Sequence, residues 1–228
     1  MKVVVARPET VEGVNSSAWI FAERVMFTKR ELRTLNNLPD SEEWLRARGA
    51  VHPDVAAIKL VLRGDRGKRV RITGMRALST CTAPLTGTYM YVPDAGANDV
   101  IGVGLNLDRP NPRAQIIEVD NNGLADHPMR MIGDYFATKT VSLKQDEEVV
   151  FQVLAQTTKH YCEFRLEVTV VDGDNEVRQV IDDYDQPFRV SADLRLEEEA
   201  YTGIPHAYDV AYVGGVFTNA GWVRVKPR

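Results

Sequence analysis

The feature that most constrains the fold is the alternation of side chains between His160 and Val170. The even positions from 162 to 170 are all apolar, whereas the odd positions between them are mostly charged or polar. A repeat of two residues is typical of a β-strand with one buried face. Similar patterns predict neighbouring strands at residues 138–143, 149–155 and 176–181. We expect four consecutive antiparallel strands, whose apolar face needs a second sheet to cover it.

The rest of the chain also has mainly strand-like patterns, and two short helices are expected at about residues 28–48. Thr28 with Glu31, and Asp40 with Glu43, have the spacing of capping boxes at helix N-termini. No internal repeat or low-complexity linker divides the chain, and β-sandwiches of 228 residues can form one unit. The sequence therefore predicts an all-β fold: an antiparallel β-sandwich with a short two-helix insertion, in a single domain covering residues 1–228.

Charge and hydropathy bear on partners and location. Charged residues make up 26% of the chain and the formal net charge is -4, which differs from the strongly basic balance of general nucleic-acid binders. The apolar run that follows Met1 and Lys2 is too short for a signal peptide. The longest uncharged run, residues 77–93, is too polar to span a membrane. Taken alone, these features indicate a cytoplasmic protein.

The segment 63–71 is predicted to be a positively charged hairpin that turns at residues 64–67. It combines five basic residues with one acid: Arg63, Arg66, Lys68, Arg69, Arg71 and Asp65. Such a surface could bind phosphate groups or an acidic partner. The alternative is that the charges keep strand edges from pairing between molecules. Since no aromatic platform accompanies the segment, nucleic acid is disfavoured. Protection of strand edges is the favoured interpretation, and Arg63, Arg66, Lys68 and Arg69 are the candidate surface for a different partner.

Common catalytic motifs are absent from the sequence. There is no Gly-x-Ser-x-Gly elbow, HExxH helix or phosphate-binding loop, and Gly102 and Gly104 lack the third glycine of a dinucleotide site. His160 and Cys162 share a strand face and could act as base and thiol, but the same face carries Phe164 and Leu166. We therefore expect both to be buried in the core and assign no catalytic or cofactor-binding residue. Whether the protein is an enzyme stays open, with a preference for a non-catalytic role.

Carboxylates in predicted loops suggest a hydrolase as an alternative function. Four of them in predicted loops could serve a hydrolase: Asp108, Asp120, Asp182 and Asp183. Acids near residues 172–176 lack the spacing of an EF-hand, and the four histidines lack the spacing of a zinc site, so no metal site is predicted. The longest irregular stretch, residues 108–133, is a candidate binding loop because long loops on rigid scaffolds often carry binding sites.

Cys81 and Cys162 are the two cysteines of the chain, and each lies in or beside a predicted strand. Buried free thiols and a disulfide are both compatible with this placement. A disulfide would close a long loop and contribute several kcal/mol.

Short motifs spread over most of the chain from Trp44 onward resemble an uncharacterised family of actinobacterial proteins. They are Trp44–Gly49, Leu62–Gly64, Val70–Met75, Cys81–Thr88, Leu107–Asp108, Tyr135–Phe136, Val141–Lys144, His160–Phe164, Pro187–Val190 and Tyr212–Val216. Members of this family typically have a membrane-spanning helix before the matching region and place the β-rich part outside the membrane. The resemblance implies no known activity.

If this resemblance holds, the chain is an extracytoplasmic domain, anchored to the membrane through a segment that this sequence does not contain. The compartment is then oxidising, and a disulfide between Cys81 and Cys162 becomes the favoured state. The leading hypothesis is a non-catalytic binding or scaffolding module that engages a protein or cell-envelope partner. The alternatives are the hydrolase and a cytoplasmic regulatory or nucleic-acid-associated protein that uses the basic segment 63–71.

Overall fold

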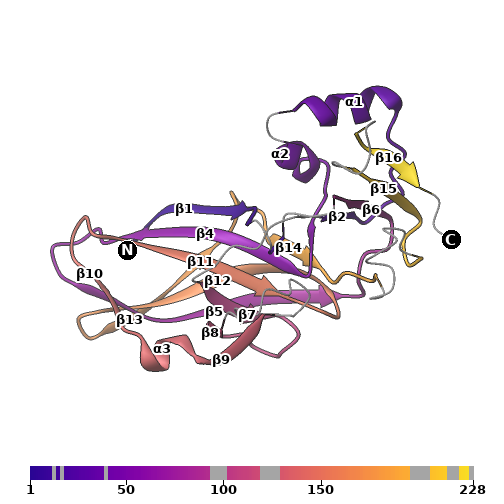
Figure 1. The fold of residues 1–228 in the computed structure, drawn as a ribbon. Helices are drawn as coiled ribbons and strands as arrows, with labels where there is room; N and C mark the ends of the chain where they lie inside the picture. Colours follow the sequence, from indigo (N-terminus) through magenta and orange to yellow (C-terminus); the bar gives the residue numbers. More distant parts are fainter. Residues whose placement is uncertain are drawn as a thin grey trace.

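The computed structural model describes residues 1–11, 14–15, 18–38, 41–92, 102–118, 129–195, 206–214 and 221–225. Asp40, Asp120 and the rest of residues 119–128 of the predicted loop at 108–133 fall outside these ranges. The described part is mostly β, with three short helices among its residues (Figure 1).

The described residues form two six-stranded sheets and one four-stranded sheet. The first sheet has the order β1 (Lys2–Glu9), β4 (Val55–Arg63), β11 (Glu148–Gln156), β7 (Val103–Asn106), β8 (Gln115–Glu118) and β9 (Arg130–Asp134). The second has the order β10 (Val141–Leu143), β5 (Val70–Thr82), β12 (Tyr161–Asp172), β14 (Phe188–Ser191) and β3 (His52–Pro53), with β13 (Asn175–Ile181) also paired to β12. The small sheet has the order β16 (Val223–Val225), β15 (Val210–Val213), β6 (Thr88–Tyr91) and β2 (Ala18–Phe21).

The first and second sheets contribute to one hydrophobic core. Leu60 and Leu62 of β4 meet Ile72 of β5 and Phe164 and Leu166 of β12 in a single buried cluster. Along β12 the even positions from Cys162 to Val170 are buried, as the alternation predicts. The alternation between His160 and Val170 therefore marks the buried face of a central strand.

Strand pairing differs from the predicted antiparallel meander. β7 with β11, β3 with β14, and β6 with β15 are parallel pairs, so the sheets are mixed. β10 pairs with β5 in the second sheet, whereas β11 lies in the first, and residues Tyr135–Thr138 form helix α3 where the strand was expected to begin. The hairpin of β12 and β13 is present, with Gly173 at a φ of 61° in its turn.

Residues 63–71 do not form the predicted hairpin. β4 lies in the first sheet and β5 in the second, so the segment between them crosses from one sheet to the other. Alternation indicates which face of a strand is buried. Both strands bury that face in the same core, so their patterns are equally compatible with one sheet and with two facing sheets. The prediction of a hairpin was wrong for this reason.

The two N-terminal helices are α1 (Lys29–Asn37) and α2 (Ser41–Arg46). The capping box at the start of α1 is complete, because Thr28 Oγ1 accepts from the Glu31 amide and the Glu31 carboxylate accepts from the Thr28 amide. Leu35 and Leu45 pack against Trp19, Phe21, Met90 and Tyr212 of the small sheet. The helices therefore cover the small sheet beside the two large ones (Figure 1).

A short segment connects the small sheet to the second sheet. Val51 exchanges two backbone hydrogen bonds with Ile20 of β2, at 2.8 and 2.9 Å. His52, the next residue, begins β3 and pairs with Val190 of β14. This connection places α2, the small sheet and the edge of the second sheet around a common space.

Candidate functional site

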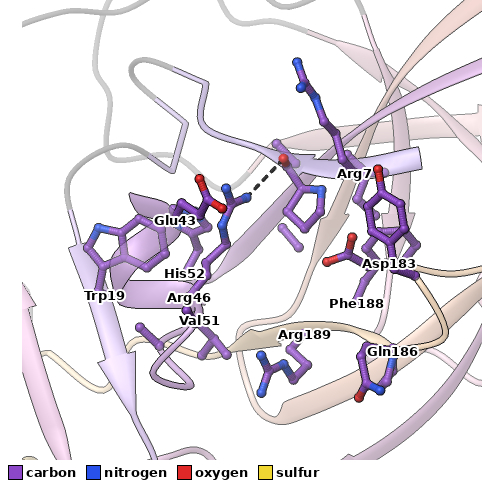
Figure 2. Close-up of a pocket in the computed structure, with 18 residues that line it drawn as sticks. Arg7, Trp19, Glu43, Arg46, Val51, His52, Asp183, Gln186, Phe188 and Arg189 are labelled. Carbon is purple, nitrogen blue, oxygen red and sulfur yellow. Dashed lines mark hydrogen bonds between the residues drawn. The ribbon is translucent and has the colours of Figure 1, made fainter. Parts of the chain in front are cut away.

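A pocket of about 500 Å³ lies where α2 and the small sheet meet the two large sheets (Figure 2). Its walls come from β1, β2, α2, β3, β4, β14 and the turn that precedes β14. The volume falls within the range of ordinary small-molecule sites, roughly 300–1,000 Å³. In Figure 2, Trp19, Glu43, His52 and Arg46 lie on one side, and Asp183 and Phe188 on the other.

The buried imidazole of His52 is an unusual feature of this wall. Its residue is only 5% exposed, and its ring centroid lies 3.9 Å from that of Trp19. Among the described residues, neither ring nitrogen has a hydrogen-bond partner. Burial, together with the nearby Arg46 charge, lowers the pKa of His52 to about 3. Backbone groups of Ala18 and Asn15 act in the opposite direction, although they do not meet the geometry of a hydrogen bond. The imidazole is therefore neutral at physiological pH, with one N–H donor and one acceptor nitrogen.

Three arginines and two acids supply the charge of the pocket: Arg7, Arg46, Arg189, Glu43 and Asp183. Nη1 of Arg46 donates to the Pro8 carbonyl at 3.1 Å, the bond drawn dashed in Figure 2. Within the described ranges, none of the three arginines lies within ion-pair distance of a carboxylate. Burial raises the pKa of Asp183, against the opposing charges of Arg46 and Arg189.

A tight turn presents an aromatic side chain at the pocket rim. Asp183 and Gln186 exchange backbone hydrogen bonds of 2.9 and 3.0 Å. The two residues between them, Tyr184 and Asp185, have φ angles of 50° and 68°. Such two-residue turns favour Asn and Gly, and a bulky residue there costs about 1–3 kcal/mol of strain. Tyr184 is nevertheless 87% exposed, so core packing does not explain its presence.

His160 and Cys162 are not the buried pair expected. His160 precedes β12, its side chain is 41% exposed, and its Nδ1 lies 3.0 Å from Oδ1 of Asp108. Cys162 is fully buried and forms a disulfide with Cys81. The prediction that both lie in the core was wrong for His160, because the strand begins one residue after it.

The four carboxylates proposed for a hydrolase do not come together among the described residues. Asp108 accepts from Thr157 Oγ1 at 2.7 Å and from the Thr158 amide at 2.8 Å. Burial alone would raise the pKa of Asp108, but these bonds and His160 hold it below the usual value. Asp182 pairs with Arg165 at 3.3 Å, Asp183 lines the pocket, and Asp120 lies outside the described residues.

A second polar network centres on Asp54, which the sequence analysis missed. Its Oδ1 accepts from the Asp193 amide at 2.7 Å, while the Asp193 carboxylate accepts from Tyr89 Oη at 2.9 Å and Arg195 Nε at 2.7 Å. Burial, with the nearby Asp193 charge, raises the pKa of Asp54 to about 7 against the opposing Asp193 amide and the Arg195 charge. No sequence motif marks these residues, because the chain brings them together from distant positions.

The predicted partner surface is partly neutralised within the protein. Arg63 donates to Glu148, and Arg66 pairs with Asp172 at 2.5 Å. Lys68 and Arg69 have no ion pair with any described residue. The charge available to a partner is therefore smaller than the sequence alone suggests.

Two further observations concern metal and membrane. No group of three or more His, Cys, Asp or Glu side chains is arranged to hold a metal ion in the part of the chain that the structure describes. Among those residues, no helix combines the length and the hydropathy needed to cross a membrane.

No protein-family model, curated protein or solved structure matches the chain.

Proposed function

We propose that the protein is a non-catalytic binding module that acts outside the cytoplasm and engages a protein or cell-envelope partner through the pocket. The observation that carries this proposal is the buried His52, whose ring nitrogens have no partner among the described residues that line the pocket. An unsatisfied buried polar group costs about 1–3 kcal/mol, and a ligand can supply the missing hydrogen bond.

The location is supported by the disulfide between Cys81 and Cys162. Disulfides persist in oxidising compartments and are rare in the cytosol. The resemblance to membrane-anchored actinobacterial proteins points the same way. In this proposal the two large sheets act as a β-sandwich scaffold, and the small sheet with its helices forms one wall of the binding site.

The hydrolase alternative gains less support. Asp108 and His160 are paired, as in many acid–base sites, but Thr157 Oγ1 donates to Asp108 and does not face the imidazole as a nucleophile would. Of the carboxylates predicted for a hydrolase, Asp108 pairs with His160 and Asp182 with Arg165, so they do not form the pair of acids that glycoside hydrolysis requires.

A photo-cross-linking residue placed at position 184 tests the proposal in the cells that make the protein. Tyr184 is exposed at the pocket rim, and Val177 of β13, which is 53% exposed and does not line the pocket, is the matched control. We expect adducts with an extracytoplasmic component from position 184 and none from position 177. Equal adducts from both positions, or none from position 184, would contradict the proposal.

A further inference from the structure

The guanidinium group of Arg46 lies in the wall of the pocket. It belongs to a partly buried side chain at the end of α2, and one of its five N–H groups donates to the Pro8 carbonyl. Arg46 lines the pocket, and no described carboxylate lies within ion-pair distance of it. A planar fork of donors matches the two oxygens of a carboxylate or phosphate.

We infer that the pocket binds an oxyanion, the carboxylate or phosphate of its ligand, with Arg46 as the anchoring cation and His52 as a hydrogen-bond donor beside it. The inference rests on the proposed function and specifies the class of ligand. Arg46 and His52 lie on the same side of the pocket in Figure 2, and both line it.

The charge balance of the pocket favours an anion over a cation. Three arginines line it against Glu43 and Asp183. Asp183 interacts with the opposing charges of Arg46 and Arg189, and the three arginines outnumber the two acids by one. His52 is neutral, so it can donate one N–H to an anionic oxygen without adding a buried charge of its own.

The rest of the ligand would lie toward the rim. Tyr184 provides an exposed ring there, held by a turn whose backbone is unfavourable for tyrosine. Residual strain at an exposed position is often retained for binding. A ligand with an apolar or flat surface next to its oxyanion therefore fits this arrangement.

Calorimetric titration of the full chain with simple probes tests the inference. Inorganic phosphate and acetate identify the preferred oxyanion, and glucuronate is compared with glucose, its neutral counterpart. We expect binding of at least one oxyanion, tighter binding of glucuronate than of glucose, and weakening by added salt. Failure of all three anions to bind, or equal affinity for glucose and glucuronate, would overturn the inference.

Matched variants locate the binding. Arg46→Gln keeps a donor for the Pro8 carbonyl and removes the charge, and we expect its affinity for the oxyanion to fall roughly 10- to 100-fold, as for other charged hydrogen bonds. Arg33→Gln is the control, because Arg33 of α1 also donates to a backbone carbonyl, that of Lys29, but does not line the pocket. Equal losses in both variants would contradict an Arg46 anchor.

The wild-type protein provides a readout that does not depend on the folding of a variant. A bound anion favours the protonated imidazole, so the NMR titration of His52 should move to higher pH when the anion saturates. An unchanged His52 titration would overturn the assigned geometry. Anion binding without adducts at position 184 would reject the proposed partner function and keep the oxyanion site, so the two failures are distinguishable.

Discussion

Asp54 joins three distant parts of the chain at a single residue. Its amide donates to the Ser191 carbonyl at 2.8 Å, its carbonyl accepts from the Thr157 amide at 2.9 Å, and its carboxylate accepts from Asp193. Its φ of 57° is one that Asn and Asp tolerate better than most residues. The carboxyl group is thus held in a poorly solvated position by its backbone.

Asp54 should make folding stability depend on pH. Because its pKa rises from 3.8 to about 7 on folding, the folded protein binds the proton more tightly. This contribution is fully present below about pH 4 and is lost as the pH rises to 7, by roughly 4 kcal/mol at most. We predict that Asp54→Asn, which keeps the acceptor oxygen and suits the positive φ, gains stability relative to wild type across this range.

Urea unfolding at several pH values measures the difference between the two proteins. His52 acts in the opposite direction, since its lowered pKa contributes stability that is present above pH 6.5 and is lost as the pH falls toward 3. That contribution is common to both proteins and cancels in the difference. A difference that does not change between pH 4 and 7 would show that Asp54 titrates normally.

At the scale of single elements, the long pairing of β5 and β12 carries the disulfide. Cys81 and Cys162 are directly opposite each other in the register, with Cα atoms 4.2 Å apart. The pairing continues from Tyr161 opposite Thr82 to Asp172 opposite Val70. The strands therefore have many contacts that do not depend on the bond.

We predict that replacing both cysteines by alanine keeps the fold and lowers the free energy of unfolding by roughly 4 kcal/mol. The bond closes a loop between residues 81 positions apart, and the estimate follows from the entropy that it removes from the unfolded chain. Denaturant unfolding, with circular dichroism to check the fold, measures the change. A count of free thiols in the unreduced, denatured protein should be zero, and a count of two would remove the support for an oxidising compartment.

At the scale of the whole molecule, charge determines which partners are disfavoured. The net charge is -4, and Arg63 and Arg66 already pair with Glu148 and Asp172. Proteins that bind nucleic acid nonspecifically rely on unpaired cations that release counterions from phosphates.

We predict no measurable binding to duplex DNA or single-stranded RNA, even at low salt. Mobility shift in about 20 mM salt is a stringent measurement, because weaker screening strengthens any contact with phosphates. Lys68→Glu with Arg69→Glu serves as a charge-reversed control. A shift in wild type that this control abolishes would restore the nucleic-acid hypothesis.

The parts of the fold that could be predicted are those that depend on neighbours in sequence. Alternation located the buried face of β12, and Thr28 with Glu31 located the start of α1. Each of these features depends only on residues that are close together in the sequence. The two cysteines by themselves allow free thiols or a disulfide, and only the resemblance to proteins outside the cytoplasm favours the disulfide. The structure contains this bond between Cys81 and Cys162.

Which strands pair, and which side chains meet in the pocket, was decided by the tertiary structure. β4 and β5 contribute buried side chains to the same core from opposite sheets. Their patterns therefore could not distinguish a hairpin from a connection that crosses between the sheets. His52, Arg46 and Asp183 are brought together by β3, α2 and a turn far along the chain. By itself the sequence determined local backbone preference and the buried side of each strand, because these follow from short-range sterics and periodicity. The partners across the core depend on packing that short-range patterns do not encode.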